Sequence, residues 1–210
     1  MKSIIKTIVA LASVSALSFA GLNEGKGTSA TVGKTAPDFS LTTASGESVS
    51  LSSFKGKEVV LEWVNFDCPF VKKHYDEGHM QKLQKEYAEK GVVWILVSSA
   101  NEEHDTFQDS EGLAARAKKQ KANATYSLVD KDGTVGKSYK AKTTPHMYVI
   151  NKEGTLAYAG AIDSIKSSDS SDIAKSDNYV AAALDDLLAG KKVANPETKP
   201  YGCSVKYEAN

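Results

Sequence analysis

Apolar residues recur in short runs along most of the chain, separated by polar and glycine-containing segments. The runs at 59–64 and 92–97 are almost continuously apolar, as in strands buried on both faces of a sheet. The segment 126–129 is predicted as a third strand. Glu62 is the one acidic residue within the first run, so it is unexpected in a buried strand. The pattern predicts three central strands and one buried carboxylate.

Alternating apolar and polar positions predict two hairpins at the ends of this series. The segment 37–51 alternates around Ser45-Gly46, which is typical of a turn. The segments 147–150 and 156–159 are joined through Glu153-Gly154. One hairpin therefore precedes the central strands and the other follows them.

Helical spacing appears between the strands. A helix is expected directly after Cys68-Pro69, because proline is tolerated in a first helical turn. Gly78 interrupts it, and helical spacing resumes until Gly91. Further helices are predicted at 111–120, around 137–140 and at 178–189. Strands alternating with helices, followed by a hairpin and a closing helix, predict an α/β domain with a central mixed β-sheet flanked by helices.

The segment 163–177 consists mostly of Ser, Asp and Lys. This composition predicts a solvated loop, with disorder as an open alternative. The aspartates also suggest a calcium loop, but their spacing fits no defined one.

The first twenty residues have the pattern of a cleavable signal peptide. Lys2 and Lys6 precede an apolar run, and Ser18 and Ala20 are small residues at the positions that signal peptidase requires. An uncleaved anchor is the alternative interpretation. We therefore expect a signal peptide at 1–20, a flexible lead-in at 21–35, one domain at 36–192 and a tail at 193–210. The mature protein is expected in the periplasm or outside the cell, without stable membrane insertion.

Charge excludes some classes of partner. The chain has 210 residues with 26 basic and 26 acidic side chains, so nothing indicates a nucleic acid or an anionic membrane as partner. Arg116 is the only arginine and is predicted on a surface helix.

Cys68 and Cys203 are the only cysteines. Two cysteines in an exported protein suggest a disulfide, although spacing alone does not decide whether they pair with each other. Cys68 precedes a helix, where the helix dipole and free N–H groups favour a thiolate. Thr144-Pro145 opens a predicted strand and could be cis. Glu62, six residues before Cys68, could transfer protons during thiol exchange if burial raises its pKa.

These residues together resemble the peroxiredoxin-like branch (AhpC/TSA-type redoxins) of the thioredoxin superfamily. The resemblance extends from about residue 32 to 207 and is carried by the following motifs: Pro37-Asp38-Phe39, Glu62-Trp63, Asp67-Cys68-Pro69-Phe70-Val71, Thr144-Pro145-His146, Gly154 with Gly160, and the tail at 199–206. It implies a thioredoxin-like fold with an N-terminal β-hairpin extension.

The resemblance also implies roles for individual residues. Cys68 matches the nucleophilic cysteine, Pro145 the cis-proline that faces it, and Thr144 the residue whose backbone binds an extended substrate. Pro69 and Phe70 flank the same substrate site. Glu62 matches the buried acid of thioredoxins.

Two departures from the family pattern bear on the mechanism. Val71 stands where thioredoxin has its second cysteine, so Cys203 is the remaining candidate for a resolving thiol. An inert Cys203, or one paired with another molecule, is the alternative. Leu61 and Asn65 replace the proline and threonine found upstream of the peroxiredoxin cysteine. Peroxiredoxins also use an arginine to polarise the peroxide, whereas Arg116 is predicted on a surface helix. We therefore do not expect efficient peroxide reduction.

Three functions remain open from the sequence. The first is a thiol–disulfide oxidoreductase acting on protein or small-molecule thiols and disulfides, without a cofactor. The others are a thiol peroxidase with antioxidant activity and a non-catalytic protein that binds a metal or a partner. His74 and His79, with Met80 nearby, suggest a thiolate–imidazole copper site with Cys68. His146 follows Pro145 and could form a hydrogen bond near the site. We expect surface or capping roles for all three histidines and no metal site.

Overall fold

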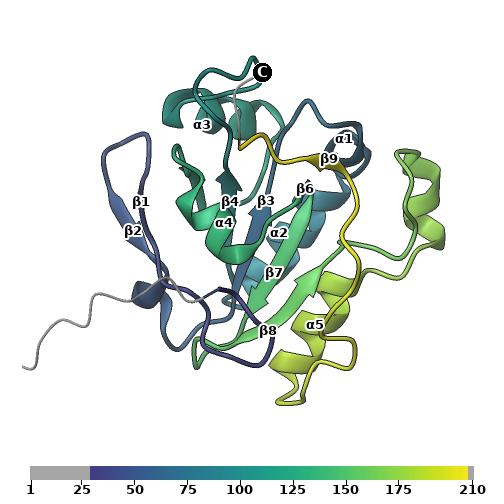
Figure 1. Cartoon of the computed structure of the whole chain (residues 1–210). Helices are drawn as coiled ribbons and strands as arrows, with labels where there is room; N and C mark the ends of the chain where they lie inside the picture. The colour runs from purple at the N-terminus through teal and green to yellow at the C-terminus, as the bar shows by residue number, and fades with distance from the viewer. Residues whose placement is uncertain (1–28, 208–210) are drawn as a thin grey trace, which may run out of the picture.

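The computed structural model of the chain describes residues 29–207. At its centre lies a five-stranded sheet (Figure 1), whose strands in spatial order are β5 (Tyr126–Val129), β4 (Val93–Ser98), β3 (Val59–Trp63), β7 (His146–Ile150) and β8 (Leu156–Gly160). Strands β3, β4 and β5 are parallel, whereas β7 runs antiparallel to both β3 and β8. The predicted mixed central sheet is confirmed.

Helices lie against the sheet because successive residues of β3 point to opposite faces. Val60 and Val64 belong to one apolar core, and Leu61 and Trp63 belong to the other. The first core is completed by helices α1 (Pro69–Tyr75), α2 (His79–Glu89), α3 (Ser110–Lys119) and α5 (Tyr179–Leu188). The second is completed by α4 (Thr134–Tyr139), the 3-10 helix η1 (Leu51–Phe54) and the N-terminal segment.

The predicted N-terminal hairpin is present as β1 (Ser40–Thr42) and β2 (Ser48–Ser50), which pair antiparallel. It forms a separate two-stranded sheet beside the central one (Figure 1). The interruption predicted at Gly78 is also confirmed, since this residue adopts a positive φ of 73° between α1 and α2. Glycine tolerates this backbone conformation better than other residues do.

The segment 163–177 corrects the prediction of a purely solvated loop. It contains the 3-10 helix η2 (Ser170–Lys175), and Asp163 at its start is only 2% exposed. Asp163, which was predicted to face solvent, is therefore a core residue, because the buried Lys73 of α1 lies against it.

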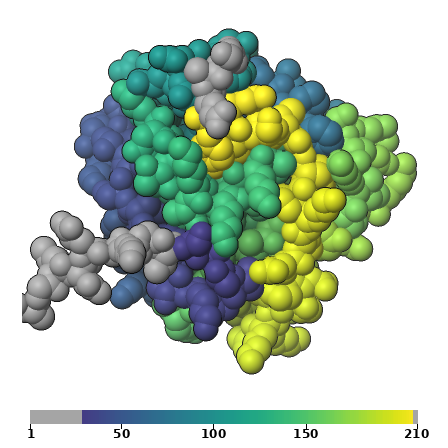
Figure 2. All heavy atoms as spheres, in the orientation of Figure 1, coloured from purple at the N-terminus to yellow at the C-terminus, as the bar shows by residue number. Residues whose placement is uncertain are grey.

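The C-terminal tail crosses the molecular surface as an extended segment (yellow in Figure 2) and contains β9 (Cys203–Ser204). This strand pairs antiparallel with β6 (Thr143–Thr144), far from it in the sequence. The tail thus returns to the edge of the domain that carries the predicted site.

The predicted signal peptide at 1–20 and most of the lead-in at 21–35 lie outside the described residues. Among the helices of residues 29–207, none is long and apolar enough to cross a membrane.

Candidate active site

Cys68 caps the N-terminus of α1. Its carbonyl oxygen accepts hydrogen bonds from the backbone N–H groups of Val71 and Lys72, and Pro69 occupies the first helical position. The Cys68 side chain is 3% exposed. The predicted placement of this thiol at a helix N-terminus is therefore confirmed, and the thiol is buried.

Cys203 lies directly against Cys68. The two Sγ atoms are 2.6 Å apart, and both cysteines are free thiols in this structure. Cys203 is the more exposed of the two. Burial, and then the neighbouring Cys68, raise the pKa of Cys203 to about 12. The structure therefore brings together two thiols that are 135 residues apart in the chain.

The Thr144–Pro145 segment completes the site. The peptide bond before Pro145 is cis, as expected, and the Cys68 thiol donates a hydrogen bond of 3.0 Å to the Thr144 carbonyl oxygen. Cys203 is the direct strand partner of Thr144. The tail therefore occupies the backbone edge that an extended substrate would use.

Gly202 allows this close approach. A Cβ atom at this position would lie 2.1 Å from the Thr144 carbonyl oxygen, and φ at Gly202 is 143°. Any other residue would push the tail away from the site, because real Cβ atoms do not approach oxygen so closely.

Pro69 and Phe70, the other predicted substrate-site residues, lie at the start of α1. Pro69 is exposed and Phe70 is half-buried. The Phe70 ring packs edge-to-face against Tyr201 of the tail, with centroids 5.8 Å apart. Only Pro69 thus presents an open surface beside the thiols while the tail is docked.

Glu62 is fully buried, as predicted. Its carboxylate accepts hydrogen bonds from Trp94 Nε1 (2.7 Å), the Tyr75 hydroxyl (3.0 Å) and Gln84 Nε2 (3.3 Å). Burial raises the pKa of Glu62 to about 7 despite these three donors. None of these bonds reaches a thiol, but Trp94 and Tyr75 belong to the same buried cluster as Cys68.

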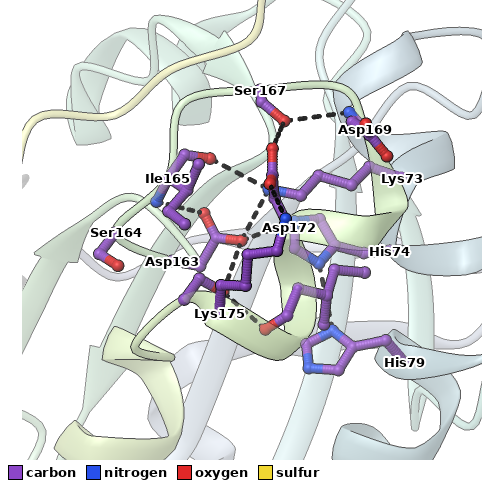
Figure 3. A network of polar contacts seen from close by, with 12 residues as sticks. Lys73, His74, His79, Asp163, Ser164, Ile165, Ser167, Asp169, Asp172 and Lys175 are labelled. Atoms are coloured by element: carbon purple, nitrogen blue, oxygen red, sulfur yellow. Dashed lines mark hydrogen bonds and ion pairs between the residues drawn. The ribbon is translucent and has the colours of Figure 1, made fainter.

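A second buried polar cluster was missed by sequence reasoning (Figure 3). Lys73 of α1 forms a 2.9 Å ion pair with Asp163, and both side chains are at most 1% exposed. Lys73 also donates to the Ile165 carbonyl oxygen at 3.0 Å. The lysine lies in helical register with apolar residues, which was the only sequence signal for its burial.

The predicted surface roles of two histidines are wrong. His74 is fully buried and His146 is 6% exposed. Burial lowers the pKa of each to about 3. His74 Nδ1 lies 3.1 Å from Nδ1 of His79, and His146 contacts the Tyr148 hydroxyl. His74 is buried because α1 packs on the segment after β8, a contact that helical spacing does not reveal.

Arg116 is on a surface helix, as predicted, but it reaches the residue next to Cys68. Its guanidinium donates two hydrogen bonds, of 2.7 and 3.1 Å, to the Asp67 carboxylate. This contact holds the pKa of Asp67 below its usual value. The guanidinium group of Arg116 therefore forms a bidentate ion pair with the Asp67 carboxylate.

The described part of the chain contains no group of three or more His, Cys, Asp or Glu side chains arranged to hold a metal ion. The arrangement brings two adjacent thiols to a helix N-terminus, which supports thiol–disulfide exchange.

Comparison with known proteins agrees with this arrangement. The family model described as AhpC/TSA family matches residues 32–159. Thioredoxin-like protein YneN from Bacillus subtilis is 36% identical over 127 residues, which cover 59% of this chain and 68% of that protein. Thiol-disulfide oxidoreductase ResA from Bacillus thuringiensis subsp. konkukian is 28% identical over 126 residues, covering 60% of this chain and 66% of ResA.

Among solved structures, the hypothetical protein SMc02350 from Sinorhizobium meliloti has a TM-score of 0.73 and 25% identity. The alignment covers 87% of this chain and 98% of that protein, so it includes regions beyond those matched in YneN and ResA. The predicted thioredoxin-like fold is confirmed. The chain belongs to the AhpC/TSA family of the thioredoxin superfamily.

Proposed function

We propose that the chain is an exported thiol–disulfide oxidoreductase of peroxiredoxin-like type, with Cys68 as nucleophile and Cys203 as resolving thiol. The observation that carries this proposal is the 2.6 Å contact between the two Sγ atoms at the N-terminus of α1. The name of the relative ResA points to the same class of reaction.

The reaction has two steps. The Cys68 thiolate attacks a substrate disulfide, forms a mixed disulfide and expels one substrate thiolate with the bonding electron pair. Cys203, after losing its proton, attacks Cys68 Sγ and expels the second thiolate. The substrate is thereby reduced to two thiols, while Cys68 and Cys203 are oxidised to a disulfide. An external dithiol of low potential returns the pair to the reduced form.

The neighbouring residues have distinct roles in this proposal. Thr144 and Pro145 present the backbone edge to an extended substrate, and Pro69 and Phe70 line its entrance. Because β9 occupies that edge, the tail moves aside when a substrate enters. Glu62 acts as the proton relay, because a carboxyl group with a pKa of about 7 can both accept and release a proton near neutral pH.

Peroxide reduction is the less favoured activity. Leu61 and Asn65 supply no counterpart of the family's proline and threonine. Arg116 is bound by Asp67. Hydrogen-bond donors to a developing charge contribute about 3 kcal/mol each to such reactions. We expect hydrogen peroxide to react with Cys68 no faster than with free cysteine.

The test is to treat reduced protein with one equivalent of a low-molecular-weight disulfide and to map the products by mass. In the wild type we expect both thiols to be lost and a Cys68–Cys203 peptide to appear. Cys203→Ser should stop at a mixed disulfide on Cys68. Ser204→Ala, a change at the adjacent tail residue, is the matched control and should behave as wild type. Absence of the linked peptide in the wild type would refute the two-cysteine mechanism.

Export is tested separately. N-terminal sequencing of the full chain produced in a bacterial host should give a mature protein that begins at Gly21. Retention of Met1 would contradict cleavage after Ala20.

A further inference from the structure

The tail that carries Cys203 is held at a second point, two residues before the thiol. Tyr201 is 6% exposed although it lies in an extended surface segment. Its hydroxyl donates a short hydrogen bond to Asp163 Oδ1, and Lys73 Nζ lies 3.5 Å from the same hydroxyl. Its ring packs on Phe70. Tyr201 is therefore anchored through both its ring and its hydroxyl.

The anchor is built around a matched pair of buried charges (Figure 3). Asp163 Oδ2 contacts Lys73 Nζ at 2.9 Å, and Oδ1 accepts from the Ile165 backbone N–H at 3.2 Å. The Ser176 hydroxyl donates to Oδ2 at 3.3 Å. Lys73 supplies a counter-ion to this buried carboxylate, which also accepts a hydrogen bond from the Tyr201 hydroxyl.

This cluster connects the two halves of the candidate active site. Lys73 belongs to α1, the helix that begins immediately after Cys68. Tyr201 is separated from Cys203 only by Gly202, which is fixed against the Thr144 carbonyl oxygen. Because Cys203 is only two residues after Tyr201, the anchored tyrosine limits how far the resolving thiol can move from Cys68. After the thiol, the tail is held by the two-residue pairing of β9 with β6 and by backbone hydrogen bonds of Val205 and Lys206. Before the thiol, Tyr201 is the buried side chain nearest to Cys203.

We propose that Tyr201 is the positioning residue for the resolving thiol, and that the buried Lys73–Asp163 pair exists to bind its hydroxyl. The proposal rests on the proposed function. An anchored tail keeps the Cys203 thiol at a high effective concentration next to Cys68, which favours the intramolecular disulfide over mixed disulfides. A released tail loses this advantage, although it leaves the Cys68 nucleophile and its helix in place.

The test is the equilibrium of each protein with reduced and oxidised glutathione. In that reaction one oxidised glutathione gives two molecules of glutathione while Cys68 and Cys203 form their disulfide. For Tyr201→Ala, which removes both ring and hydroxyl, we expect the equilibrium constant to fall by about tenfold or more, equivalent to about 30 mV. Tyr201→Phe keeps the ring and should give a smaller decrease.

The chain offers a matched control. Tyr87 is 1% exposed and donates to Asp185 Oδ1 at 2.8 Å, so it also pairs a buried phenol with a carboxylate. It connects α2 with α5, and its hydrogen bonds go to Ala181 and Asp185 rather than to the tail. Tyr87→Ala and Tyr87→Phe should lower the midpoint of urea unfolding and leave the glutathione equilibrium unchanged.

A second measurement separates positioning from damage to the nucleophile. The initial rate at which an aromatic disulfide labels Cys68 should be no lower in Cys203→Ser with Tyr201→Ala than in Cys203→Ser alone, because a released tail uncovers the buried Cys68 thiol. The positioning role is overturned if Tyr201→Ala changes the glutathione equilibrium less than twofold, or if Tyr87→Ala lowers it equally. If the wild type itself forms no Cys68–Cys203 disulfide, the proposed function fails together with this inference.

Discussion

Two buried carboxylates contact helix α1, and they are stabilised in opposite ways. Asp163 lies against a buried cation, Lys73, and accepts from Tyr201 as well. Glu62 receives three hydrogen bonds, all from uncharged side chains. The comparison teaches that hydrogen bonds from neutral donors do not replace a counter-ion. Burial still raises the pKa of Glu62 to about 7, so it can exchange protons near neutral pH, whereas Asp163 is paired with a buried cation.

The largest effect is expected for removal of the anion of the matched pair. Asp163→Ala leaves Lys73 as an uncompensated buried cation, which typically costs about 3–5 kcal/mol. We expect a loss of this size in the free energy of unfolding of the reduced protein, measured with urea at pH 7.

Two variants make this prediction specific. Replacing both partners in Lys73→Met with Asp163→Leu should recover most of the lost stability, because neither charge is then buried alone. Asp172→Ala, which removes a surface ion pair with Lys175, should have little effect. An Asp163→Ala protein as stable as the wild type would show that the Lys73 ammonium group becomes solvated without its partner. Asp163 would then not depend on a counter-ion in the way that distinguishes it from Glu62.

The second effect is a pH dependence that Glu62 alone should produce. Its pKa is near 4.5 in the unfolded chain and about 7 in the folded protein, so between these values the folded state binds the additional proton. The resulting stability is complete below pH 4.5 and is lost as the pH rises through 7. One pKa unit corresponds to about 1.4 kcal/mol, so the loss is on the order of 3 kcal/mol.

The measurement is the difference in unfolding free energy between wild type and Glu62→Gln from pH 4.5 to 8. A difference is needed because His74 and His146 have pKa values lowered to about 3, and they destabilise the fold as the pH falls below 6.5. Their contribution is common to both proteins and cancels. A difference that is flat across this range would mean that Glu62 stays ionised although it is buried, and the expected pH dependence would be wrong.

The contrast between the two carboxylates also shows what the sequence can predict. Glu62 was identified because it interrupts a continuous apolar strand, and burial follows from that position. Asp163 stands among serines, lysines and other aspartates, so its composition indicates solvent. Its burial depends on Lys73, ninety residues earlier in the chain. Local pattern therefore predicted the strands and helices, which are stabilised by periodic apolar contacts, but not polar contacts between distant segments.

The same distinction applies to the candidate active site. The order of strand, cysteine and helix predicted the position of Cys68, because each feature is adjacent in the sequence. The contact with Cys203 was suggested by the presence of two cysteines in an exported chain and by the family resemblance, but spacing did not decide it, and the anchoring role of Tyr201 was not foreseen. Arg116 likewise reached Asp67 across 49 residues. Such contacts depend on how α3 and the tail pack, and spacing along the chain does not encode this.

The smallest expected effect concerns a single donor to Glu62. Tyr75→Phe removes the hydroxyl that donates to Oε1 at 3.0 Å and leaves Trp94 in place. A donor to a carboxylate favours its charged form, so its loss should raise the pKa of Glu62 further above 7. The midpoint of the Glu62-dependent stability loss should therefore move to higher pH. The measurement is the difference in unfolding free energy between Tyr75→Phe and the double variant Tyr75→Phe with Glu62→Gln, as a function of pH. Tyr158→Phe, which loses a buried hydroxyl bonded to Ala161 and Thr198, should leave the midpoint unchanged. A midpoint that moved to lower pH instead would contradict this prediction. The hydrogen bonds from neutral donors would then not be what holds the pKa of Glu62 down against burial, and another group would have to stabilise the ionised carboxylate.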